Sequence, residues 1–181
     1  ASYKEGVQSQ LDDQPGFTIA SWQQRPESLG FVKIRSDNPF EAPVIQPNYL
    51  EAEEDRKVLI AGMKLARRLM RTEPLAPYFD FEQYPGDHIQ TDDELLQIAR
   101  ERGTTTFHVM GSCRMGPSSD PTSVVDEKLR VQGIDNLRVV DASIMPTMLS
   151  ANLNAGAMMI GEKGADIILD KPALEPIIIS D

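Results

Sequence analysis

The stretch FHVMGSCRMG, residues 107–116, gathers rare chemistry into one short part of the chain. It contains one of the two histidines, His108, and the single cysteine, Cys113, close to two glycines. The β-branched and aromatic run over residues 104–110 favours a strand that ends at the first of these glycines. Outward from this stretch, residues 129–143 favour two short strands around a glycine-containing turn.

Three segments carry the helical period. Apolar residues recur at three- and four-residue steps over residues 51–71, where acids crowd the first turns and bases the last. A shorter helix is predicted over residues 91–103, opened by a capping box of Thr91 and Glu94. A third helix is predicted over residues 154–169. Three glycines in it leave small notches for close packing, namely Gly156, Gly161 and Gly164.

The N-terminal part favours strands and loops. Residues 16–24 and 29–36 are expected to pair as neighbouring antiparallel strands across a proline-containing turn. Residues 37–50 contain three prolines, which limits them to short edge strands and extended loop. Residues 1–16 are polar and unpatterned, so they are expected to form a linker.

Composition narrows the class of protein. The 181 residues suffice for one ordinary domain, and the net charge of −10 argues against binding to nucleic acid, which needs a basic face. A single cysteine excludes an internal disulfide and fits a reducing compartment. No apolar run approaches the length of a membrane span, and no signal peptide is recognised.

Most chemical alternatives for this motif are weak. His108 and Cys113 offer two zinc ligands where three or four are needed, and His88 lies in a loop without a nearby cysteine, so no metal site is predicted. A Cys113 nucleophile paired with His108 stays open, although a packing role suits the thiol better. The glycine spacing of residues 111–116 is that of a phosphate loop, but the Lys-Ser/Thr that should follow is absent.

His108 alone is compatible with a buried structural histidine at a strand end. A second set of residues makes a functional role more attractive. Asp141 ends an apolar run, and Asn152 and Asn154 stand at the start of the last predicted helix, where free N–H groups attract an anion. Together these residues suggest one pole of a cofactor site.

The sequence resembles the C-terminal region of the glucose–methanol–choline (GMC) flavin oxidoreductases. Its motif HVMGSCRMG is similar to the family's His-x-x-Gly-(Thr/Ser)-Cys-(Arg/Lys)-Met-Gly, and it is followed at matching spacing by LRVVDASIMPTMLSANLNAG. Upstream, the Arg-Pro, Gly and PNYL landmarks of QQRPESLGFVKIRSDNPFEAPVIQPNYL are also similar to the family's. The resemblance covers residues 17–169.

The resemblance implies an α+β fold, with the antiparallel sheet of a substrate-binding domain flanked by helices. Residues 17–130 would form that domain, and residues 131–170 would supply the terminal strand and helix of the FAD domain. Residues 1–16 would be a linker and residues 171–181 a tail. The family's Gly-x-Gly-x-x-Gly fingerprint is absent, so the chain is expected to be a C-terminal fragment that lacks the N-terminal FAD-binding domain.

The resemblance also implies the site. His108 would be the catalytic histidine and Asn152 the second catalytic residue. Backbone at Asp141 and Ala142 and at Asn154 and Ala155 would face the flavin. Two positions depart from many relatives, which have proline where this chain has Val109 and Gly156.

The implied function is oxidation of the CH–OH group of an alcohol, choline-like or another primary alcohol, to the aldehyde by hydride transfer to FAD. The fragment alone is expected to be inactive, not to retain FAD, and to self-associate through exposed apolar faces. The implied location is the cytoplasm, or the periphery of the inner membrane in the parent enzyme. Two alternatives stay open: a non-catalytic binding or oligomerisation module, and a split enzyme completed by a separate flavin-binding chain.

Overall fold

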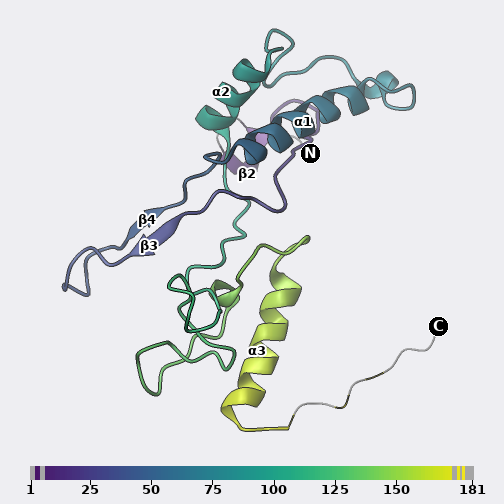
Figure 1. The fold of residues 1–181 in the computed structure, drawn as a ribbon. Coiled ribbons are helices and arrows are strands. Elements are labelled where there is room, and N and C mark those ends of the chain that lie inside the picture. The colour runs from purple at the N-terminus through teal and green to yellow at the C-terminus, as the bar shows by residue number, and fades with distance from the viewer. Residues whose placement is uncertain (1–2, 5–6, 173–174, 176, 178–181) are drawn as a thin grey trace. The chain divides into compact units, whose positions relative to one another are not determined.

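The structure is a computed structural model that describes residues 3–4, 7–172, 175 and 177 (Figure 1). It divides into two compact units, Ala1–Thr105 and Thr106–Asp181, called here the first and second unit. The first unit contains β1 (Tyr3–Lys4), β2 (Val7–Leu11), β3 (Phe31–Lys33), β4 (Val44–Gln46), α1 (Glu53–Met70), η1 (Ala76–Tyr78) and α2 (Asp92–Arg102). The second unit contains η2 (Ala142–Ile144) and α3 (Asn154–Ile168).

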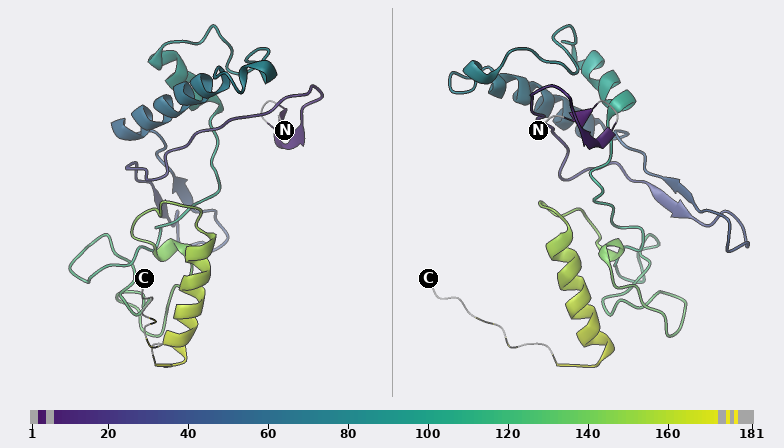
Figure 2. Two further views of the ribbon diagram at one scale, coloured as in Figure 1. Left: turned by 90° about the vertical axis from the view of Figure 1, so that its right-hand side faces the viewer. Right: turned by 180° about the vertical axis from the view of Figure 1, so that it is seen from behind.

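Helices α1 and α2 form where local signals predict them. Acids occupy the first turn of α1 and arginines its last turn, which complements the helix dipole. The predicted capping box at the start of α2 is confirmed, because Thr91 and Glu94 each accept a hydrogen bond from the other's backbone N–H. The two helices lie side by side (Figure 2). Ile60 of α1 and Leu95 of α2 are buried.

Strand pairing differs from the prediction. β3 pairs antiparallel with β4, with Val32 opposite Ile45, whereas residues 16–24 contain no strand. The expected pairing of residues 16–24 with 29–36 is therefore wrong, and the prediction of short strands within 37–50 is confirmed. A turn stabilised by the Ser36–Glu41 hydrogen bond brings β4 back onto β3. β1 and β2 form a second antiparallel pair, inside the segment predicted as a linker.

Two charged side chains tie distant segments of the first unit to α1. The buried carboxylate of Asp55 accepts the backbone N–H groups of Glu27 and Ser28, each at 2.9 Å. Arg67 forms a two-pronged ion pair with Glu82, in which the side chains are only 14% and 13% exposed. These contacts hold loops that contain no regular structure of their own.

The second unit has an apolar core between α3 and irregular chain. The core residues are Val125, Leu129, Ile144, Met145, Leu153 and Ile160. The predicted notch at Gly164 is confirmed, because a Cβ there would overlap Val140 and come within 3.3 Å of Leu129. Gly161, by contrast, has no heavy atom of the described residues within 4 Å of its Cβ position.

Two strand predictions in the second unit are corrected. Residues 104–110 form no strand, because Phe107 has a φ of +60°, which no strand residue adopts. Residues 129–143 turn back on themselves, with an isolated antiparallel bridge between Arg130 and Arg138, but form no full strand among the described residues. The predicted α+β class is confirmed, because the described residues form two small antiparallel strand pairs and three α-helices. Most of the predicted tail, 171–181, lies outside the described residues.

Candidate active site

The structure brings His108 and Asn152 together. Nε2 of His108 lies 3.1 Å from Oδ1 of Asn152, across 44 residues of sequence and within the second unit. His108 is half-buried and Asn152 is exposed. A hydrogen-bonded pair of this kind can bind one small polar group from two sides.

The pair can act on a hydroxyl group. An imidazole nitrogen accepts a proton when it is bare, and an amide presents either its oxygen or its nitrogen, since a half-turn exchanges the two. With the amide nitrogen turned inward, Nδ2 of Asn152 donates to a hydroxyl oxygen while Nε2 of His108 receives the hydroxyl proton. The arrangement therefore suits proton removal from an alcohol.

A short backbone clamp holds the loop that follows His108. The N–H of Cys113 donates to the carbonyl of Ser143 at 2.9 Å, and the N–H of Met115 donates to that of Ile144 at 2.7 Å. Gly111 enters this clamp at a φ of +80°, in the left-handed region that favours glycine. The motif's backbone, more than the Cys113 thiol, thus joins the histidine loop to η2.

Gly156 leaves room for side chains of the preceding turn to pack against the first turn of α3. A Cβ on Gly156 would lie 2.7 Å from Cδ1 of Leu149 and 3.0 Å from Cε of Met145. The absence of a larger residue at Gly156 therefore lets these two side chains pack over the first turn of α3. This packing gives a structural reason for glycine at this position.

The four residues expected to face a flavin lie at two element starts. Oδ1 of Asp141 accepts the N–H of Ser143 at 2.7 Å and so caps η2, whose first residue is Ala142. Asn154 and Ala155 open α3 and are exposed. The N-cap residue of α3, Leu153, makes no side-chain cap hydrogen bond, and the first turn of α3 contains no acidic residue.

Two side chains beside His108 were not anticipated as site features. Phe107 and Val109 flank the histidine, and each is 74% exposed. The left-handed backbone of Phe107 is uncommon for an aromatic residue and is often found near functional sites. The sequence gives no sign of this conformation, since the surrounding β-branched residues favour a strand.

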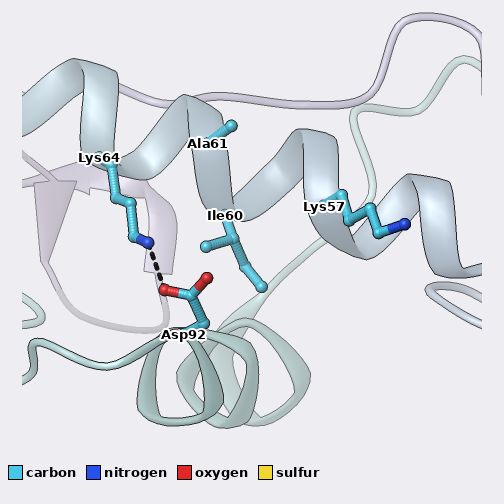
Figure 3. Close-up of a pocket in the computed structure, with 5 residues that line it drawn as sticks. All are labelled: Lys57, Ile60, Ala61, Lys64 and Asp92. Carbon is cyan, nitrogen blue, oxygen red and sulfur yellow. Dashed lines mark ion pairs between the residues drawn. The ribbon is translucent and has the colours of Figure 1, made fainter.

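A surface pocket of the first unit lacks the features of a catalytic site. It is lined by Lys57, Ile60, Ala61, Lys64 and Asp92 (Figure 3). Lys64 is paired with Asp92 within the pocket, and Lys57 is paired with Glu53 at 2.7 Å. Both cations are thus neutralised by neighbouring acids. Among the described residues, no three His, Cys, Asp or Glu side chains gather as a metal site would require.

Comparison with protein families identifies the lineage. The family model described as GMC oxidoreductase matches residues 26–161, which include both His108 and Asn152. The chain belongs to the GMC oxidoreductases.

Two relatives of the chain are named as dehydrogenases of choline or of alcohols. Human mitochondrial choline dehydrogenase is 48% identical over 89% of the chain, and an alcohol dehydrogenase [acceptor] of Pseudomonas putida is 44% identical over 86% of it. The chain spans only 27% and 28% of the length of these relatives. None of the described helices is long and apolar enough to cross a membrane.

Solved GMC structures share the fold. Pyridoxine 4-oxidase from Mesorbium loti superposes with a TM-score of 0.74 at 31% identity, over 83% of this chain and 29% of that one. An FAD-dependent oxidoreductase from Chaetomium thermophilum gives a TM-score of 0.71 at 30% identity, over 78% of this chain and 24% of that one.

Proposed function

We propose that this chain is part of an FAD-dependent enzyme that oxidises the CH–OH group of an alcohol to the aldehyde. The substrate class is a choline-like or other primary alcohol, as the names of the human and Pseudomonas putida relatives suggest. The observation that carries the proposal is the 3.1 Å contact between His108 and Asn152, since it joins a proton acceptor to a group that can hold the same hydroxyl.

In this proposal His108 is the general base. Its Nε2 accepts the hydroxyl proton while Nδ2 of Asn152 donates to the oxygen and fixes the direction of the C–H bond. FAD, when bound, supplies the acceptor for the hydride that leaves the alcohol carbon. A positioned base contributes about 10²–10⁴-fold to the rate of such a step.

The residues at the two element starts fit a flavin. The uncapped first turn of α3, at Asn154 and Ala155, offers N–H groups and the positive end of a helix dipole to an electron-rich ring oxygen. Backbone at Asp141 and Ala142, at the start of η2, would hold the ring from a second element. Residues of η2 and of the start of α3, Ile144 and Leu153, belong to one apolar core.

We further propose that the isolated chain does not retain FAD, since residues 1–181 contain no Gly-x-Gly-x-x-Gly to bind the diphosphate. The purified chain should be colourless. Flavin absorbance that survives gel filtration would contradict this.

The outer side of α3 supports the proposed domain division. Four large apolar residues of α3 and its C-terminal cap stay exposed, namely Met158, Met159, Ile168 and Leu169, at 65%, 61%, 55% and 62%. We propose that residues 131–170 complete an FAD domain supplied by other parts of a longer polypeptide, and that residues 17–130 belong to the substrate domain. The isolated chain should therefore self-associate, which sedimentation over a range of concentrations measures.

A non-catalytic binding or oligomerisation module is the second candidate, favoured by the same exposed apolar residues. Colour and turnover after the chain is joined to a flavin-binding partner separate the two candidates. Location in the cytoplasm or at the periphery of the inner membrane stays a prediction, and the human relative is named as mitochondrial.

The decisive experiment uses the enzyme that contains this chain. His108→Ala should slow flavin reduction by the alcohol by at least ~10²-fold, about 2.7 kcal/mol of barrier, with flavin content unchanged. Cys113→Ala is the matched control in the same motif and should leave the rate within a few-fold. If stopped-flow reduction were normal in the His108 variant and collapsed in the Cys113 variant, the roles would be reversed.

A further inference from the structure

The side chain of Arg114 lies in the middle of the histidine motif and binds neither His108 nor Asn152. Its Nη1 donates to Oγ1 of Thr122 at 2.9 Å, and its Nη2 lies 3.6 Å from a carboxylate oxygen of Asp120. Nε is buried and has no hydrogen-bond partner among the described residues. The two outer nitrogens of the guanidinium thus contact Thr122 and Asp120, which both lie on the loop that follows the motif.

Asp120 and Thr122 form a rigid receptor for this guanidinium. The other carboxylate oxygen of Asp120 accepts both the hydroxyl of Thr122 at 2.7 Å and its backbone N–H at 2.9 Å. These hydrogen bonds from Thr122, aided by the charge of Arg114, hold the pKa of Asp120 below its ordinary value, although slight burial opposes them. Asp120 is therefore ionised at neutral pH and stays a partner for Arg114.

The backbone of Arg114 links the same loop to the active site. Its N–H donates to the carbonyl of Gly111 at 3.2 Å, and its carbonyl accepts the N–H of Val124 at 2.9 Å. The flanking residues, Cys113 and Met115, donate in the opposite direction to η2. The motif thus lies between two segments, and Arg114 fastens the side that η2 does not reach.

We propose that Arg114 is a positioning residue, which fixes the histidine loop through Asp120 and Thr122 and so holds His108 at its distance from Asn152. The catalytic consequence rests on the proposed function, while the positioning itself does not. Lysine cannot replace the arginine fully, because one ammonium lacks the planar fork that reaches two acceptors in a fixed geometry.

The first test observes His108 directly. The chain contains only two histidines, so ¹⁵N-histidine labelling gives two imidazoles, with His88 as internal reference. Arg114→Met should move the ring ¹⁵N resonances of His108 and leave those of His88 in place. Arg138→Met is the matched control, since Arg138 is exposed and donates only to the carbonyl of Lys128 among the described residues. Unchanged His108 resonances in Arg114→Met would overturn the proposal.

The second test measures turnover in the enzyme that contains this chain. Arg114→Met should lower kcat by about 10- to 100-fold, the loss expected from a small misplacement of a reacting group, with KM and flavin content unchanged. Arg114→Lys should recover part of this loss. A rise in KM at constant kcat would instead show that Arg114 acts on substrate binding, and would overturn the proposal.

Thr122→Val keeps the proposal testable if Arg114→Met does not fold. It removes one acceptor of the guanidinium and leaves the arginine in place, so the same His108 resonances should move by a smaller amount. No movement in a folded Thr122→Val chain would overturn the proposal. If His108→Ala left turnover intact while Arg114→Met still moved the His108 resonances, the proposed function would fail and the positioning role of Arg114 would stand.

Discussion

The contacts that stabilise the interior of the first unit differ in kind from those that stabilise the second. In the first unit, a few charged side chains bridge loops to α1, as Asp55 does to residues 27–28 and Arg67 does to Glu82. In the second unit, backbone hydrogen bonds between irregular segments surround an apolar core, and α3 closes it. The first unit should thus be sensitive to charge and pH, and the second to side-chain volume.

The largest expected effect comes from Arg67. Arg67→Met leaves the nearly buried Glu82 carboxylate without its partner and removes donors to the carbonyls of Gly86 and Ile89. Loss of one member of such a pair costs about 3–5 kcal/mol of unfolding free energy. Fluorescence of Trp22, the only tryptophan, follows the first unit during denaturant unfolding. Adding Glu82→Gln should recover part of the lost unfolding free energy. An equal loss of stability in the second unit would contradict the view that the two units are stabilised by different contacts.

Asp55 tests the pH sensitivity of the first unit. Burial alone would raise the pKa of Asp55, but hydrogen bonds from Ser28, Glu27 and Gln23 outweigh it and lower the pKa below the usual 3.8. The carboxylate therefore stabilises the fold fully above about pH 3.8, and this contribution is lost as the pH falls through the lowered value.

Asp55→Asn should accordingly cost about 1.5–3 kcal/mol near neutral pH, the usual worth of hydrogen bonds to a charged group. Its deficit relative to the parent chain should shrink as the solution is acidified below the ordinary pKa. Trp22 fluorescence across a pH series measures both. A deficit that grew on acidification would show that the sign is wrong.

Two glycines of α3 test the volume sensitivity of the second unit. Gly164→Ala places a methyl group against Val140 and Leu129 and should cost about 1–3 kcal/mol. Gly161→Ala is the matched control on the open side of the same helix and should gain about 0.5–1 kcal/mol from helix propensity. Amide hydrogen exchange in α3 reports both changes. If the two substitutions changed stability equally, close packing at Gly164 would not explain the loss.

The smallest expected effect is local to the first unit. Thr91→Ala removes the side-chain cap of α2 and should cost about 1 kcal/mol. Thr91→Ser, which keeps an acceptor oxygen, serves as the control. Thermal unfolding followed by Trp22 fluorescence compares the three chains, and a loss as large as that of Arg67→Met would contradict the ranking.

The comparison also explains what could be predicted from sequence. Helices α1, α2 and α3 were predicted to within about two residues, because their period and caps are local. The predicted partner of β3 was wrong, because the actual pairing with β4 depends on a turn that lies later in the chain. No periodic pattern in the sequence indicates the hydrogen bonds of Asp55 to residues 27–28 or the contacts of Arg114.

The candidate site was predicted only through family resemblance. Pattern alone suggested that His108, Asp141 and the asparagines of the last helix lie near each other, and left a structural histidine open. The family's motif singled out Asn152, which the structure places beside His108. The left-handed backbone of Phe107 could not be foreseen, because its neighbours are strand formers.

The separation of 44 positions between His108 and Asn152 along the chain also determines when the two can meet during synthesis. A ribosome adds about 5–20 residues per second, so the asparagine is made roughly 2–9 s after the histidine. Closing a short loop takes well under a millisecond, so translation, and not diffusion, limits when the two side chains first meet. For most of those seconds the nascent histidine loop lacks η2, and for all of them it lacks α3. Slow codons across residues 109–151 would lengthen its exposure to chaperones and proteases.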